Sequence, residues 1–100
     1  MKPDLPTYHM EYKRDNIANA IMYGFTYIEH NDLMVGEIYA TPHMMKEIVK
    51  NFIDEVAFDY IPEGIGIFRG AYLKFYPSSK DNEIIFVTHS EEYRLKLILI

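Results

Sequence analysis

The sequence predicts a small α+β domain: a single antiparallel β-sheet of about six strands, with one short and one long amphipathic helix packed on one face. Three observations indicate this class. Several stretches alternate between apolar and polar residues, one segment has apolar residues at helical spacing, and turn-forming residues separate the strand-like runs. A length of 100 residues is typical of one domain, so we expect residues 1–100 to form a single unit with residues 1–6 as a flexible N-terminal arm.

The first expected strand covers residues 7–13, where apolar and polar side chains alternate. A short helix of about two turns follows it. Asp15 is the expected N-cap of this helix, and Gly24 stands where a left-handed residue often ends one. The apolar positions of the helix gather on one face: Ile17, Ala18, Ala20, Ile21 and Met22.

Two further strands are expected at residues 25–29 and 33–40, which are rich in β-forming side chains. The polar cluster His30-Asn31-Asp32 separates them and is typical of a hairpin connection, so the two strands should pair antiparallel. Gly36 inside the second strand indicates a β-bulge or a close approach by another group.

The long amphipathic helix is the clearest element of the sequence. Thr41 is a good N-cap residue, and Pro42 suits the first helical position. Apolar residues then recur at helical spacing: Met44, Met45, Ile48, Val49, Phe52, Ile53 and Val56. Charged and polar residues form the opposite, solvated face: Lys46, Glu47, Lys50, Asn51, Asp54 and Glu55.

After the turn at Pro62-Glu63-Gly64, three strands are expected at residues 65–76, 84–89 and 94–100, arranged as an antiparallel meander. The resulting order is β-α-β-β-α-β-β-β, and its first six elements match a ferredoxin-like core. We expect the last strand to lie at a sheet edge, where it could pair with a second copy of the chain.

Composition restricts the compartment and the partners. The absence of cysteine excludes disulfides and cysteine-based metal sites and fits a reducing compartment. We find no apolar run of the length of a signal peptide or a membrane span, so we expect a cytoplasmic protein without a membrane partner. The net charge of −5 argues against direct binding of nucleic acid, and the acidity lies in residues 1–65, with 5 basic and 11 acidic side chains. A basic or nucleic-acid-handling protein is the expected partner.

No sequence motif indicates catalysis. His9 and Glu11 share one face of the first strand, and His89 placed opposite them would resemble a metal or acid–base site. Exposed polar positions on a strand are the simpler interpretation of this spacing. We therefore expect no enzyme activity, no metal and no cofactor.

Nine tyrosines without a tryptophan favour a protein-binding surface, because a tyrosine ring has an apolar body and a polar tip. Rows of rings also build cores, and we expect about half of them to do so. The expected protein-binding set lies among acidic residues: Tyr8, Tyr12, Tyr27, Tyr39, Glu11, Glu29, Asp32 and Glu37. An alternative basic and aromatic patch, suited to stacking of single-stranded nucleic acid, comprises Arg69, Tyr72, Lys74, Tyr76, Arg94 and Lys96.

These observations predict a small non-enzymatic protein-binding module. Ile, Lys, Asn and Tyr, whose codons are rich in A and T, supply 34 of the 100 residues. This bias fits a phage or mobile-element accessory protein that inhibits a host enzyme or a nucleic-acid-handling defence complex, in which case it acts in the host cytoplasm. The alternative is a homo-oligomeric structural or regulatory module with tyrosine-rich subunit interfaces.

Overall fold

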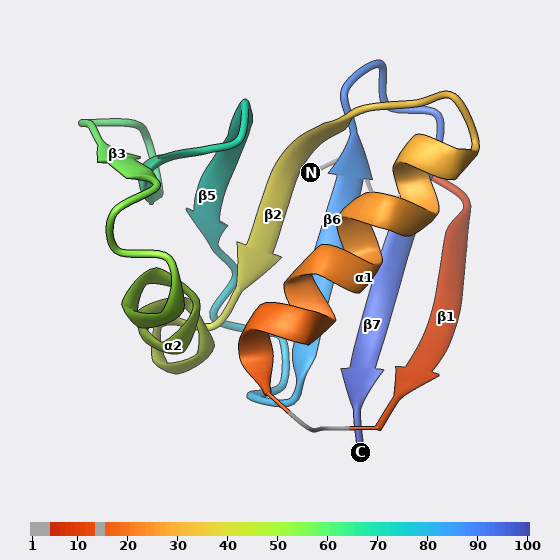
Figure 1. The fold of residues 1–100 in the computed structure, drawn as a ribbon, viewed down its shortest axis with the longest axis horizontal. Helices are drawn as coiled ribbons and strands as arrows, with labels where there is room; N and C mark the ends of the chain where they lie inside the picture. The colour runs from red at the N-terminus through yellow and green to blue at the C-terminus, as the bar shows by residue number, and fades with distance from the viewer. Residues whose placement is uncertain (1–4, 14–15) are drawn as a thin grey trace.

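The computed structural model describes residues 5–13 and 16–100 and shows one sheet of seven strands with two helices (Figure 1). The α+β class is confirmed, but the expected single antiparallel sheet of six strands is wrong, because the sheet is mixed. The elements in chain order are β1 (Thr7–Tyr12), α1 (Ile17–His30), β2 (Val35–Ala40), α2 (Pro42–Asn51), β3 (Val56–Phe58), β4 (Gly64–Phe68), β5 (Ala71–Phe75), β6 (Glu83–Thr88) and β7 (Arg94–Leu99).

The strand order across the sheet is β1-β7-β6-β2-β5-β4-β3. β1 pairs parallel with β7 and β2 pairs parallel with β5, while the other neighbours are antiparallel. The expected edge position of the last strand is therefore wrong, because β7 lies between β1 and β6. The edge strands are β1 and β3, so β7 offers no free edge for the expected pairing with a second copy.

Helix α1 replaces the short helix and the strand that the sequence predicts at residues 25–29. Ile21, Phe25 and Ile28 lie at helical spacing, and all are buried against the sheet, so tertiary packing outweighs the β-propensity of this stretch. Gly24 does not end the helix but lies inside it, where its missing side chain makes room for the Phe86 ring. The ferredoxin-like order of elements is therefore wrong, because it required a strand at residues 25–29.

The N-terminus of α1 is capped by Asn16, whose side-chain oxygen accepts a hydrogen bond from the Asn19 N–H at 2.7 Å. Asp15, the expected cap, lies outside the described residues. Helix α2 begins as predicted, because the Thr41 hydroxyl accepts from the Met44 N–H at 3.1 Å and Pro42 occupies the first turn. The helix ends at Asn51, earlier than its apolar pattern suggests, since Val56 already belongs to β3.

The expected strand at residues 65–76 is a hairpin of β4 and β5. Arg69 and Gly70 both have positive φ, at 50° and 82°, and they form the two-residue turn that joins Phe68 to Ala71. The predicted irregularity at Gly36 is confirmed, because the β2–β6 register shifts between Val35 and Glu37. A Cβ at Gly36 would lie 2.7 Å from the His89 Cα, so the two backbones approach closely there.

The main core lies between the sheet and the two helices, which pack against the same face (Figure 1). Its centre contains fully buried side chains from both helices and from the middle strands, among them Ile28, Ile48, Phe68 and Phe86. Neither described helix is long and apolar enough to cross a membrane. The opposite face of the sheet has only a small apolar cluster of its own, and it is this face that carries the candidate site.

Candidate functional site

Neither helix of the described chain packs on the second face of the sheet, which we call the helix-free face. Side chains alternate between the two faces of a strand, so residues next to the core positions point to this side. Its members are Thr7, His9 and Glu11 of β1, Glu37 and Tyr39 of β2, Tyr72 and Lys74 of β5, Glu83, Ile85 and Val87 of β6, and Arg94, Lys96 and Ile98 of β7, together with Tyr76 just after β5.

Strand register arranges this face in two rows. The first row runs from β1 to β5 through His9, Lys96, Ile85, Tyr39 and Lys74. The second, one step along the strands, contains Thr7, Arg94, Val87, Glu37 and Tyr72. Each row therefore combines cationic, apolar and aromatic side chains across five strands.

Glu37 is held at the β2–β5 side of the face. One of its carboxylate oxygens lies 2.8 Å from the Lys74 ammonium nitrogen and accepts a hydrogen bond from the Tyr39 hydroxyl at 3.1 Å. Burial, together with the neighbouring Glu37 charge, raises the pKa of Tyr39 above its ordinary value. Tyr39 thus stays a neutral hydrogen-bond donor, and its ring forms an edge contact with Tyr76 at a centroid distance of 6.1 Å.

Glu83 is held at the β6–β7 side of the face. One of its carboxylate oxygens accepts hydrogen bonds from the Ser79 hydroxyl at 2.9 Å and the Lys80 N–H at 3.1 Å, and the other lies 3.3 Å from the Lys96 ammonium. Burial by itself would raise the pKa of Glu83, but these three donors stabilise the carboxylate and lower the pKa below its ordinary value.

The centre of the face is apolar and covered from within the chain. Tyr39, Ile85 and Val87 are buried, and Leu5 and Tyr76 pack against them. Arg94 fixes the N-terminal segment here, because its guanidinium donates to the Leu5 carbonyl at 3.1 Å and its backbone N–H donates to the Pro6 carbonyl at 2.8 Å. Residues 1–4, the rest of the expected arm, lie outside the described residues.

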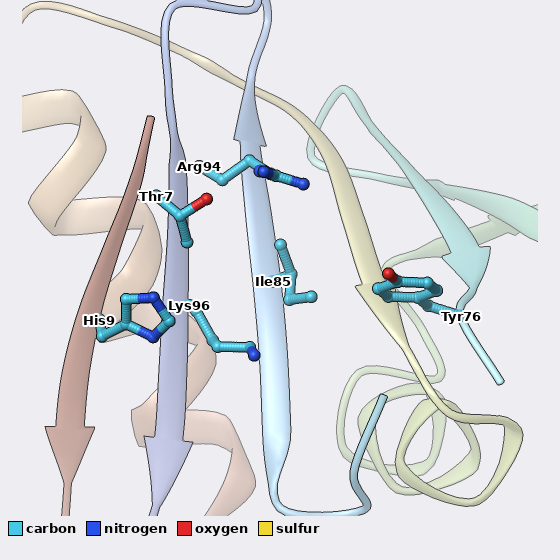
Figure 2. Close-up of a pocket in the computed structure, with 6 residues that line it drawn as sticks. All are labelled: Thr7, His9, Tyr76, Ile85, Arg94 and Lys96. Carbon is cyan, nitrogen blue, oxygen red and sulfur yellow. The ribbon is translucent and has the colours of Figure 1, made fainter. Parts of the chain in front are cut away.

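Two hollows flank this apolar centre. One, of about 170 Å³, is lined by Thr7, His9, Tyr76, Ile85, Arg94 and Lys96 (Figure 2). The other, of about 210 Å³, is lined by Gly36, Glu37, Tyr72, Lys74, Thr88, His89 and Glu91. The face is therefore not flat, and it can accept protruding groups at two places.

The residues of the predicted acidic set are divided by the fold. Glu37 and Tyr39 lie at the middle of the helix-free face, and Glu11 lies on its β1 side. The other members lie elsewhere: Tyr8, Tyr12, Tyr27, Glu29 and Asp32. Glu29 belongs to the last turn of α1 and Asp32 to the loop after it, where Asp32 has a φ of 59°.

Several tyrosines contact one another where β1 lies beside α1 and the segment before β7. The rings of Tyr8 and Tyr93 meet edge to face at 5.2 Å, and those of Tyr12 and Tyr23 meet at 5.1 Å. The Tyr93 hydroxyl is buried without a hydrogen-bond partner among the described residues, and burial raises the pKa of Tyr93. Half-buried Tyr12 and Tyr27 also pack against the main core.

The predicted basic and aromatic patch maps largely to the helix-free face. Tyr72, Lys74, Tyr76, Arg94 and Lys96 all lie there, with Lys74 and Lys96 in ion pairs. Arg69 does not: at the β4–β5 turn it pairs with Glu55 at 3.0 Å and lies over the Phe68 ring. Because β2 pairs with both β5 and β6, the fold unites residues that the sequence analysis assigned to two competing surfaces.

Sequence reasoning missed Glu83, Ile85 and Val87, although their spacing of two in a strand places them on one face. Leu5 is predicted to belong to the flexible arm of residues 1–6, but it packs against the apolar centre of the face. The hypothetical cluster of His9 and His89 does not form, since β7 separates β1 from β6 and His9 lies beside Lys96. Within the described residues, no group of three or more His, Cys, Asp or Glu side chains could hold a metal ion.

No protein family, curated protein or solved structure matches the chain.

Proposed function

We propose that this chain is a small non-enzymatic protein-binding module whose helix-free face contacts the partner. The observation that carries the proposal is the concentration of Tyr39, Tyr72 and Tyr76 on the one sheet face without a helix, next to two hollows. Tyrosines are enriched at the centres of protein interfaces because their rings bury a large area while the hydroxyl keeps a polar contact.

The charges of the face support a protein partner over nucleic acid. Lys74 and Lys96, which would neutralise phosphates in a single-strand binder, each lie against a carboxylate. A charged side chain that is already in an ion pair costs less free energy to bury in an interface than an unpaired one. Such pairs can therefore help to orient a protein partner on this face. Tyr72, with 45% of its surface exposed, is the most exposed of the three tyrosines on this face.

The class of partner is proposed from composition. An acidic chain rich in residues whose codons contain mainly A and T supports a phage or mobile-element protein that acts in the cytoplasm on a host enzyme or a nucleic-acid-handling complex, with the acidic surface steering a basic partner.

A pull-down with matched variants tests this proposal. We expect the full chain to recover a partner from bacterial lysate, Tyr72→Ser to lose about 30-fold or more of it, and Tyr60→Ser to recover it unchanged. Tyr60 is the control because it is 97% exposed, lies between β3 and β4 and lines neither hollow. Equal recovery by the wild type and Tyr72→Ser would place the interface elsewhere.

A second copy of the chain is the alternative occupant of the face. The pairs Glu37/Lys74 and Glu83/Lys96 put both signs of charge on one surface, as a self-complementary two-fold contact requires. Light scattering at micromolar concentration distinguishes the two occupants. A dimer that Tyr72→Ser converts to a monomer would support a homo-oligomeric module. A monomeric wild type would support binding of a different protein.

A further inference from the structure

The hollow at the β1–β7 side of the helix-free face is built from complementary walls. The parallel pairing of β1 with β7 places Thr7 beside Arg94 and His9 beside Lys96. Ile85, the neighbour of Lys96 on β6, forms an apolar floor with only 4% of its surface exposed. Tyr76 stands on the opposite side, so one wall is cationic and the other aromatic (Figure 2).

The two cationic side chains of the hollow, Lys96 and Arg94, both extend toward its apolar floor (Figure 2). Lys96 is anchored by Glu83 at 3.3 Å, and Figure 2 shows its side chain extending across the strand toward Ile85. The lysine ammonium has three donors, so the contact with Glu83 leaves it able to donate to a group above the floor. The guanidinium of Arg94 extends over the same floor from the next position of β7 that faces this side (Figure 2).

None of the lining residues is acidic, and the carboxylate of Glu83 already partners Lys96. The hollow therefore attracts an anion. Because Glu83 offsets part of the positive charge and the chain as a whole carries −5, a singly charged anion fits better than the dianion of a phosphate monoester.

The apolar floor and the aromatic wall of the hollow favour an anion that carries an apolar group. A volume of about 170 Å³ is close to the size of an apolar cavity that holds one benzene molecule, and below the range of complete small-molecule sites. It accommodates one side chain and one carboxylate. Ile85 and the Tyr76 ring contribute apolar contact, and Lys96 contributes a charge-assisted hydrogen bond. Arg94, whose guanidinium donates to the Leu5 carbonyl at 3.1 Å, adds positive charge.

From this geometry we infer that the hollow binds the C-terminal carboxylate of a partner protein whose last side chain is apolar. The inference rests on the proposed function, since it names the part of the partner that the helix-free face recognises. The carboxylate lies against Lys96 and Arg94, and the last side chain lies on Ile85 beside Tyr76.

The test uses the full chain, labelled with ¹⁵N, and an N-acetylated pentapeptide, Gly-Gly-Ser-Gly-Leu, as the free acid or the C-terminal amide. We expect the acid to shift the amide resonances of β1, β6 and β7 with a Kd on the order of millimolar, and the amide and inorganic phosphate to leave them unmoved. Equal binding of acid and amide, or tighter binding of phosphate, would overturn the carboxylate assignment. N-acetyl-leucine binding while the pentapeptide is excluded would indicate a free small acid and overturn the chain-end assignment.

Variants locate the binding in this hollow. Lys96→Gln should weaken binding of the acid by about ten-fold or more, and Lys46→Gln, an exposed change on α2, should not alter it. His9→Glu is the second variant, because His9 is exposed and the change adds a repelling carboxylate without removing a buried contact. Unchanged binding in folded His9→Glu and Lys96→Gln would refute the site.

The two proposals fail separately. If Tyr72→Ser abolishes recovery of a partner while the free-acid peptide does not bind, the protein-binding function stands and the carboxylate site falls. If the peptide binds as described while Tyr72→Ser retains every partner, the site stands and the proposed function of the face falls.

Discussion

Glu83 is the residue on which one side of the helix-free face depends. Its side chain has 10% of its surface exposed, and its carboxylate accepts hydrogen bonds from the Ser79 hydroxyl and the Lys80 N–H and forms an ion pair with the Lys96 ammonium. These contacts tie the loop before β6 to β7 and also fix the position of Lys96 in the proposed carboxylate site. Because the pKa of Glu83 is lowered in the folded state, the ionised form stabilises the fold.

Glu83→Gln should therefore reduce the free energy of unfolding by about 1–3 kcal/mol at neutral pH. A lowered folded-state pKa contributes stability above the unfolded pKa, about 4.3 for glutamate, and the contribution disappears as the pH falls through the folded pKa. The difference between the variant and the wild type in urea denaturation should shrink below about pH 4. Glu29→Gln, at the exposed end of α1, is the control and should show neither effect; a loss that does not depend on pH would contradict the role of the charge.

At the scale of single elements, α1 shows how packing decides a structure against local preference. The stretch from Phe25 to Glu29 favours a strand by composition, yet it forms the second half of a helix because Ile21, Phe25 and Ile28 are buried together against the sheet. Gly24 makes this contact possible, since a Cβ at this position would overlap the Phe86 ring. The glycine is thus a packing residue, where the sequence suggests a helix terminator.

Gly24→Ala should destabilise the protein by about 1–3 kcal/mol, although alanine is the better helix former by about 1 kcal/mol. The overlap with Phe86 reverses the sign that propensity predicts. Thr26→Ala, at an exposed position of the same helix, also raises helix propensity and should be neutral or slightly stabilising. Thermal melts followed by circular dichroism measure both, and a stabilised Gly24→Ala variant would refute the proposed contact.

At the scale of the whole molecule, the two ends of the chain pair with each other. Residues 7–12 form their ladder with residues 94–99, and β7 in turn connects β1 to β6 (Figure 1). Since β7 is the one strand neighbour of β1 among the described residues, the first strand cannot be placed before the last one is present. Such non-local pairing slows folding, because loop-closure entropy is lost before the contacts form.

A chain that stops after Tyr93 should therefore fail to fold cooperatively. It loses Leu95, Leu97 and Leu99 from the core and leaves β1 without a partner. A chain that lacks only Ile100, which is 63% exposed, should melt close to the full-length temperature and serves as the control. A cooperative thermal transition in the shorter chain would show that β7 is dispensable, as an edge strand could be.

Some features of this protein depend only on residues that are close together along the chain, and these features can be predicted without the fold. The α+β class follows from its periodicities, the start of α2 from Thr41 and Pro42, and the irregularity at Gly36 from a glycine within a strand. Capping and alternation act over a few residues, so their signals can be read without the fold.

The strand order, the parallel pairs and the composition of the helix-free face arise instead from contacts between distant segments. Strand pairing joins segments as distant as β1 and β7, and which faces are buried together depends on the whole chain. For the same reason Tyr39 lies near Tyr72 and Tyr76 on one surface, although the sequence places them in regions of opposite charge balance. The candidate site is a property of the assembled sheet, because no single segment contains more than a few of its residues.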